Sequence, residues 1–240
     1  MSIVSIVGAG PGDPGLVTVK ALELVRNAEV LVYDRLVSLE LVLQATGAAR
    51  IARDGLNQED VNDLLVHHGL RGRRVVRLKG GDPFLFGRGY EEVEALAAAG
   101  VPYEVVPGVS TLTAVPGLAG IPLTTRDVAA QVTVLTGTSA DGGELDYAHL
   151  AATPGTLVIF MGLRRLERIA DGLILAGRPV DEAAAVISRV SLPGAEVRIG
   201  TLGTIAAVAR GLRAPAVAVV GEVAALGAPA QALPLSFPTR

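Results

Sequence analysis

Short runs of β-branched residues alternate along the chain with longer segments in which Ala and Leu recur at helical spacing. In the first half, this pattern predicts buried strands at 2–8, 29–34, 73–78 and 103–108. It predicts helices at 18–28, 58–69 and 90–100. Thr18 suits the N-cap of the first helix, and Gly69 and Gly100 stand where the other two are expected to end. Strands that alternate with helices indicate a parallel sheet.

The same alternation restarts near residue 114, so we expect two α/β domains, 1–113 and 114–240. The strands expected in the second domain are 130–137, 155–162, 183–190 and 215–223. Its expected helices are 163–176 and 203–211, and 196–203 is expected to add an antiparallel strand. The closing stretch 227–240 shows neither period and is expected to be irregular.

Composition narrows the class of protein. Half of the 240 residues are hydrophobic, which is enough for a sizeable globular core. A formal net charge of -3 argues against binding to nucleic acid or to an anionic membrane surface, so local arginines must hold any anionic ligand. The absence of Cys excludes disulfides and thiolate catalysis, and the three His form no zinc-binding pattern, so we expect no metal.

Neither end of the sequence predicts targeting to a membrane. The N-terminal stretch lacks the basic region of a signal peptide and reaches Gly and Pro too early for a transit helix. The apolar stretch 214–226 is interrupted by Glu222 and falls short of the roughly 20 residues that span a bilayer. We therefore expect a cytoplasmic protein.

The glycine-rich stretch 8–15, GAGPGDPG, directly follows a predicted strand. Gly8 and Gly10, with Asp34 at the end of the next strand, are typical of a dinucleotide fingerprint. However, Asp13 stands where the third glycine is required, and the prolines around it prevent a helix from beginning before about Thr18. The details argue against a pyrophosphate site, while a plain tight loop stays open.

A second glycine-rich stretch, 78–89, reads LKGGDPFLFGRG. Gly80 and Gly81 leave the backbone bare, so that a ligand can contact main-chain N–H and C=O groups. Asp82 precedes a proline and is held extended at the carboxyl end of the sheet, where open α/β folds bind ligands. The alternative is a plain strand-to-helix loop in which both phenylalanines are buried. Arg88, between two glycines, is either an exposed contact for an anion or part of a solvated face.

A third stretch, 106–127, combines small and hydroxyl residues with three prolines, which suits a preorganised wall between two domains. Ser110 and Thr111 lie near its start. Their hydroxyl groups can hydrogen-bond a ligand or can equally cap a helix at 111–119, and the sequence favours neither.

The segments VGAGPGDPGLVTVKA, VYDRLVS, RVVRLKGGDPFLFGRG, VPYEVVPG, AGIPLTTRD, VIFMGL and PAVAVVGEV follow one another between about residue 3 and residue 223. In content and order they resemble the uroporphyrinogen-III C-methyltransferases, a branch of the tetrapyrrole methylases. The resemblance implies S-adenosylmethionine as methyl donor, a cofactor cleft between two α/β domains, and a homodimer. It also implies two successive methylations that convert uroporphyrinogen III to precorrin-2.

The resemblance assigns roles to individual residues. The implied cofactor positions are Pro11, Gly80, Gly81, Asp82, Leu85, Ser110, Thr111, Met161 and Val190. Asp34 takes the place of the base that removes a proton from the tetrapyrrole, although a carboxylate that caps a helix or pairs with Arg35 is an alternative reading. Uroporphyrinogen carries eight carboxylates, and their natural bidentate partners are Arg35, Arg88 and Arg126.

The sequence departs from the family on the substrate side. Arg53, in a shortened stretch 50–60, is the nearest match to the lysine expected to donate a proton, and Arg cannot readily do so. Thr125 and Thr138 replace two histidines, and Val190 replaces a glycine. Two alternatives therefore stay open besides the uroporphyrinogen enzyme: a methylase with another acceptor, and a non-catalytic protein that binds S-adenosylmethionine. A nicotinamide dehydrogenase is a more distant one.

Overall fold

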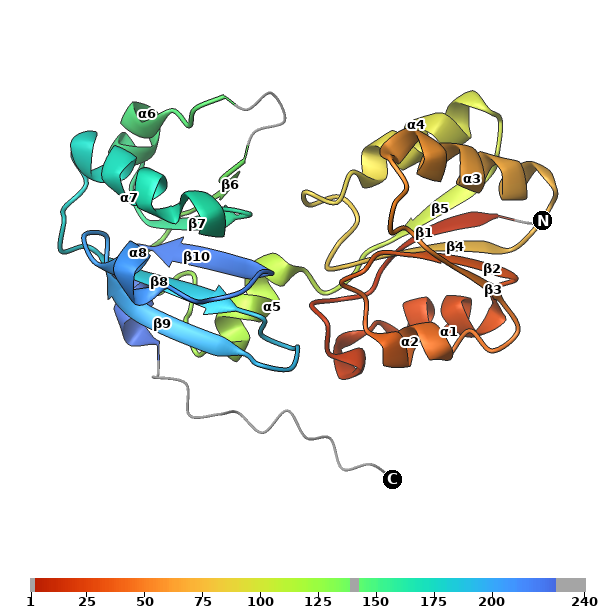
Figure 1. Ribbon diagram of the computed structural model, residues 1–240, viewed down its shortest axis with the longest axis horizontal. Coiled ribbons are helices and arrows are strands. Elements are labelled where there is room, and N and C mark those ends of the chain that lie inside the picture. Colours follow the sequence, from red (N-terminus) through yellow and green to blue (C-terminus); the bar gives the residue numbers. More distant parts are fainter. Residues whose placement is uncertain (1–2, 139–142, 228–240) are drawn as a thin grey trace. The chain divides into compact units, whose positions relative to one another are not determined.

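A computed structural model describes residues 3–138 and 143–227, and the stretch expected to be irregular lies almost entirely outside them. The chain divides into two compact units, Met1–Thr111 and Leu112–Arg240 (Figure 1). The boundary expected at residue 113 falls close to this division, and we propose that the units are the domains of the protein. No helix in the described ranges is long and apolar enough to cross a bilayer.

The first unit is a parallel five-stranded sheet between two layers of helices (Figure 1). Its strands are β1 (Val4–Gly8), β2 (Val30–Tyr33), β3 (Ala49–Ala52), β4 (Val75–Lys79) and β5 (Tyr103–Val106), in the order β3-β2-β4-β1-β5. The helices α1 (Val19–Asn27) and α2 (Leu39–Leu43) cover one face, and α3 (Gln58–Leu70) and α4 (Gly89–Ala98) cover the other; η1 (Pro14–Leu16) precedes α1. The predicted parallel α/β arrangement is confirmed.

The two faces of this sheet follow the two-residue period of its strands. In β4, Val76 and Leu78 pack with α1 and α2, whereas Val75 packs with α3 and α4. In β1, Val7 belongs to the first of these cores and Ile6 to the second. Both faces are therefore buried, which is why the central strands read as continuous apolar runs.

The predicted helix ends are partly right. Thr18 caps α1, because its Oγ1 accepts a hydrogen bond from the N–H of Ala21 at 3.2 Å. Gly100 follows α4 with φ of 66°. Gly69, in contrast, lies inside α3, where a Cβ would come within 2.4 Å of Val101 Cγ1. This glycine permits close packing and does not end the helix.

The second unit contains a mixed five-stranded sheet. Its strands are β6 (Val132–Thr136), β7 (Thr156–Phe160), β8 (Ala183–Ser188), β9 (Glu196–Thr201) and β10 (Ala216–Val220), in the order β6-β7-β10-β8-β9. Only β6 and β7 pair in parallel, and the predicted antiparallel strand is β9. The helical segments are α5 (Thr111–Leu118), α6 (Tyr147–Ala152), η2 (Leu163–Arg165), α7 (Leu166–Leu175), α8 (Ile205–Val208) and η3 (Glu222–Leu226).

Candidate active site at the carboxyl edge of the first sheet

The order in which strands are added to the first sheet changes between β1 and β4, with β2 and β3 on one side and β5 on the other. These neighbouring strands are parallel, but β1 continues into α1 on one face and β4 continues into α4 on the other. The segments that follow them therefore separate at the carboxyl edge of the sheet. Open α/β sheets bind ligands at such a topological switch point. Both glycine-rich stretches predicted to hold a ligand, 8–15 and 78–89, lie there.

The two glycine-rich loops are joined through their backbones. The N–H of Gly81 donates to the carbonyl of Gly10 at 2.7 Å, and the N–H of Gly10 donates back at 3.2 Å. Gly81 has φ of 65°, and a Cβ on it would lie 2.8 Å from Thr111 Oγ1. A Cβ on Gly108, after β5, would lie 2.3 Å from the carbonyl oxygen of Gly81. Gly10 and Gly81 are buried, so the three loops pack backbone against backbone, and only glycine fits at these positions.

Asp82 joins the loop after β4 to the loop after β5. Its Oδ1 accepts from the N–H of Phe84 at 2.9 Å, and its Oδ2 accepts from the N–H of Gly108 at 3.1 Å. The side chains of Phe84 and Phe86 are exposed, at 54% and 41%. The alternative of a plain loop with two buried phenylalanine rings is therefore wrong.

The other predicted cofactor residues of the first unit surround this backbone. A Cβ on Gly80 would contact only Leu36 Cβ, at 3.7 Å, so the main chain there is unobstructed. Pro11 and Leu85 are half-buried beside the loops. Thr111 begins α5 and Ser110 precedes it. This set suits a ligand with a polar end that is bound by main-chain groups.

Two predicted cofactor residues belong to the second unit. Met161 directly follows β7, is 53% exposed and has φ of 53°, in the left-handed region that non-glycine residues rarely adopt. Val190 follows β8, and its side chain is buried in the core of this unit. A ligand can contact the thioether of Met161, but only the main chain of Val190.

Charged side chains lie buried on one face of β4. Because Val76 and Leu78 face α1 and α2, the alternate residues Arg77 and Lys79 face α3 and α4. Arg77 and Glu92 are completely buried, and Lys79 is 1% exposed. We call Arg77, Lys79 and Glu92 the buried charged cluster. The sequence analysis did not identify these three residues as part of a site. Two basic residues at alternate positions of a central strand could have indicated a buried charged group.

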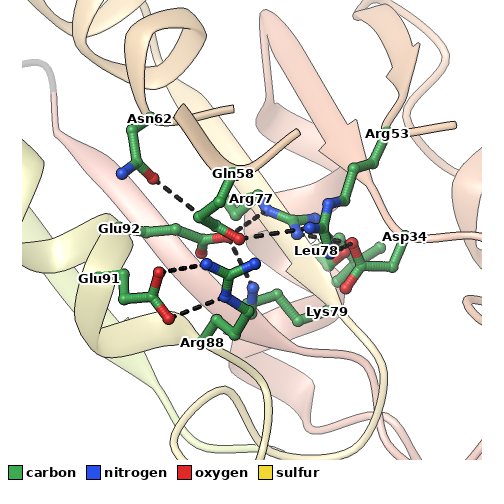
Figure 2. Close-up of polar contacts among 10 residues, drawn as sticks. All are labelled: Asp34, Arg53, Gln58, Asn62, Arg77, Leu78, Lys79, Arg88, Glu91 and Glu92. Carbon is green, nitrogen blue, oxygen red and sulfur yellow. Dashed lines mark hydrogen bonds and ion pairs between the residues drawn. The ribbon is translucent and has the colours of Figure 1, made fainter. Parts of the chain in front are cut away.

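Glu92, on α4, receives the hydrogen bonds of this cluster on one oxygen (Figure 2). Its Oε1 accepts from Arg77 Nε at 3.0 Å, from Lys79 Nζ at 2.7 Å and from Gln58 Nε2 at 3.4 Å. Its Oε2 is buried and has no hydrogen-bond partner among the described residues. Burial lowers the pKa of Lys79, as does the charge of Arg77, while Glu92 opposes the shift.

Asp34 lies at the edge of the buried charged cluster, directly after β2 (Figure 2). Its Oδ1 accepts a hydrogen bond from Arg77 Nη2 at 2.6 Å and lies 3.9 Å from Arg53 Nη1. Arg53 also donates to Gln58 Oε1 at 3.3 Å. The expected alternative, a pair with Arg35, is wrong. No described residue donates to Asp34 Oδ2, and the side chain is 23% exposed, so one carboxylate oxygen is open.

The three arginines expected to bind substrate differ in their contacts. Arg88 forms a bidentate pair with Glu91, at 2.8 and 2.6 Å, and these hydrogen bonds hold the pKa of Glu91 below its ordinary value. An anionic ligand must compete with Glu91 for this guanidinium group. Arg35, in the first unit, and Arg126, in the second, are exposed and pair with no other residue in the described ranges.

The tetrapyrrole (corrin/porphyrin) methylase family matches residues 4–206 of this chain. The chain is 45% identical over 230 residues to a siroheme synthase 2 of Klebsiella pneumoniae, with 93% of this chain and 50% of that protein covered. It is 46% identical over 231 residues to a siroheme synthase 2 of Aeromonas hydrophila, with 93% and 49% covered. The chain thus spans about half the length of the curated relatives it matches.

Solved structures match this chain over nearly the full length of both proteins. A uroporphyrin-III C-methyl transferase of Thermus thermophilus, complexed with S-adenyl homocysteine, has a TM-score of 0.82 and 39% identity, covering 94% of this chain and all of that one. A cobalt precorrin-4 methyltransferase has a TM-score of 0.85 and 29% identity, covering 92% and 95%. These likenesses confirm the two-domain α/β fold and the resemblance inferred from the sequence motifs. The chain belongs to the tetrapyrrole (corrin/porphyrin) methylase family.

Proposed function

We propose that this chain is an S-adenosylmethionine-dependent C-methyltransferase that converts uroporphyrinogen III to precorrin-2 by two successive methylations, in siroheme or cobalamin biosynthesis. One observation carries the proposal: the unobstructed main chain of Gly80 and an open carboxylate oxygen of Asp34 occupy the same edge of the first sheet. The similarity to a uroporphyrin-III C-methyl transferase solved with S-adenyl homocysteine supports it. A homodimer and a cytoplasmic location are parts of the proposal that come from the sequence alone.

The residues present fit the proposed cofactor. When bound, S-adenosylmethionine supplies a methyl group activated by a positively charged sulfur. The main chain of Gly80 is open to it, since a Cβ there would contact only Leu36, and Asp82 keeps the loop in place through its bonds to Phe84 and Gly108. Leu85 offers an apolar wall of the kind that an adenine ring requires.

Asp34 is the proposed base. A pyrrole ring that has accepted a methyl group on carbon carries an extra positive charge, which it loses when a proton leaves. The open Oδ2 of Asp34 can accept that proton while Oδ1 stays bonded to Arg77. Because carbon methylation depends chiefly on the orientation of the two reactants, the protein needs few other chemical groups.

The identity of the methyl acceptor is the part of the proposal for which the sequence offers an alternative. Within residues 3–138 and 143–227, no side chain pairs with the guanidinium groups of Arg35 and Arg126, so both can bind substrate carboxylates. Thr125, which replaces a histidine of the family, accepts a hydrogen bond from the N–H of Val128, and Thr138 donates to the carbonyl of Met161. These replacements, with Arg53, favour a methylase of a different acceptor as the second candidate; a non-catalytic protein that binds S-adenosylmethionine is the third.

Turnover of the purified protein with S-adenosylmethionine and freshly prepared uroporphyrinogen III tests the proposal. We expect precorrin-2, with one molecule of S-adenosylhomocysteine released for each methyl group transferred. A protein that binds S-adenosylhomocysteine but gives no methylated product contradicts it and favours another acceptor or the non-catalytic alternative.

S-Adenosylhomocysteine is expected to raise the melting temperature, because a ligand that binds only the folded state stabilises it by mass action. At a concentration of about 100 times Kd, the free energy of unfolding rises by about 2.7 kcal/mol. Differential scanning fluorimetry and calorimetry measure the shift and Kd. NADH is the control ligand and should give no shift. An absence of binding at millimolar S-adenosylhomocysteine would contradict the cofactor assignment.

Arg53→Lys is expected to keep or raise the rate of methylation. Lysine retains the positive charge near Asp34 and can also donate a proton, which a guanidinium group cannot readily do. Rates on uroporphyrinogen III are compared with those of Arg50→Lys, an exposed arginine of β3. A clear fall in Arg53→Lys alone, with equal affinity for S-adenosylhomocysteine, would contradict a simple replacement of lysine and would indicate a contact that requires a guanidinium group.

A further inference from the structure

We propose that Arg77 is a positioning residue of the methylation reaction, which holds Asp34 as an oriented carboxylate with Oδ2 open toward the substrate. This inference rests on the proposed role of Asp34 as the base. Arg77 is completely buried and does not reach solvent, so its effect on the reaction passes through Asp34.

The guanidinium group of Arg77 is fixed in one orientation by three different partners (Figure 2). Its Nε donates to Glu92 Oε1 at 3.0 Å, and its Nη1 donates to the carbonyl of Leu78 at 3.2 Å. The planar fork then directs Nη2 at Asp34 Oδ1, 2.6 Å away. Since α4, β4 and the end of β2 supply these partners, the orientation of Asp34 is coupled to the packing of the sheet against α4.

Stability alone does not account for this arrangement. The same face of the sheet is packed by apolar residues such as Val75, and apolar side chains generally replace a buried ion pair without loss of stability. Two buried cations, Arg77 and Lys79, share the single carboxylate of Glu92, whose Oε2 has no partner in the part of the chain that the structure describes. With Lys79 protonated, the buried charged cluster has one positive charge in excess, and Asp34 is the anion that balances it.

The charged groups that face Asp34 come from three segments. Arg77 on β4 contacts it directly, and Arg53, after β3, lies farther away at 3.9 Å. Arg35, next to Asp34 in sequence, is exposed. Glu92 contacts Arg77, and Lys79 contacts Glu92, so neither residue touches Asp34 itself. Arg77 is therefore the charged group that contacts Asp34 most closely, and its removal should disturb the placement of Asp34 most.

A double-mutant cycle separates a positioning role from a structural one. Four proteins are compared: wild type, Arg77→Gln, Asp34→Asn and the double variant. In the wild-type background, Arg77→Gln should lower kcat by about tenfold or more, with the roughly 10²–10⁴-fold effect of a whole general base as the upper bound, and should change KM for uroporphyrinogen III much less. In the Asp34→Asn background, the same substitution should cause little further loss.

A further readout follows from the geometry of the guanidinium fork. Arg77→Lys, which keeps the charge but not the fork, should lose less activity than Arg77→Gln but should not recover the wild-type kcat. If Arg77→Gln does not fold, Arg77→Lys takes its place in the cycle.

Arg178→Gln is the matched control. Arg178 is a buried arginine of the second unit that forms a bidentate pair with Glu182, at 2.7 and 2.6 Å. Its substitution should lower stability but leave kcat unchanged. An equal fall of kcat for Arg77→Gln in both Asp34 backgrounds would overturn the inference.

A failure of the proposed function can be distinguished from a failure of the inference about Arg77. If wild type does not methylate uroporphyrinogen III, the proposed function fails, and the four proteins are then compared by urea unfolding. A coupling between residues 34 and 77 in the free energy of unfolding would support the inference that Arg77 holds Asp34. Additive effects of the two substitutions would overturn it.

Discussion

Gly81→Ala is expected to weaken the binding of S-adenosylhomocysteine at least about tenfold, because the loss of one main-chain contact and one hydroxyl contact exceeds 1.4 kcal/mol. The added Cβ would lie 2.8 Å from Thr111 Oγ1, so it must displace a second proposed cofactor residue. Alanine at φ of 65° also strains the loop that Gly81 joins to Gly10. Isothermal titration calorimetry measures the loss of affinity.

Strain and ligand contact are separated by a second glycine of the same unit. Gly100 has nearly the same φ, 66°, but a Cβ on it meets nothing within 4 Å. Gly100→Ala should therefore lose stability by about 1–2 kcal/mol through strain and keep full affinity for S-adenosylhomocysteine. If a folded Gly81→Ala protein binds the ligand as tightly as Gly100→Ala does, the cofactor is bound elsewhere.

Asp34→Asn is expected to lower the rate of methylation by about 10²–10⁴-fold, the range of a general base. The amide has nearly the same volume and can still accept from Arg77 through its oxygen, but it cannot take up a proton. Affinity for S-adenosylhomocysteine should stay within about twofold, because Asp34 is not among the proposed cofactor contacts. Single-turnover rates on uroporphyrinogen III and calorimetry make the two measurements.

The control for Asp34→Asn is Asp54→Asn, in the exposed loop that follows β3. It removes the same charge from the same unit without touching the buried charged cluster, and should methylate at the wild-type rate. Melting temperatures identify any loss of folding, since Asp34→Asn leaves Arg77 with one anionic partner fewer. Wild-type turnover by Asp34→Asn would show that Asp34 is structural and that the base is another group.

Much of the fold was predictable because its causes are local. The cap made by Thr18, the apolar runs of the central strands and the restart of the pattern near residue 114 depend on neighbours within a few positions. Two of the features that were not predicted, β3 and the role of Gly69, have the opposite cause. β3 is short and mostly exposed, so it has no apolar run, and Gly69 is required by Val101, which another part of the chain supplies.

The candidate site divides in the same way. The sequence predicts Gly80, Gly81 and Asp82 as ligand-binding residues because successive glycines at the end of a strand leave the main chain without side chains. Arg77 and Glu92 were missed, although both are completely buried. Charged residues usually indicate a solvated surface, and only their partners reveal that they are buried.

By itself, the sequence determined the α/β class, the division into two units, the glycine-rich loops and the family, since these follow from residue type, spacing and order along the chain. Only the tertiary structure decided which charges meet. Asp34 pairs with Arg77, 43 positions away, and not with the adjacent Arg35, because parallel pairing of β2 with β4 brings the ends of the two strands side by side. No local pattern encodes that register, since hydrogen bonds between strand backbones and the packing of both faces of the sheet establish it together.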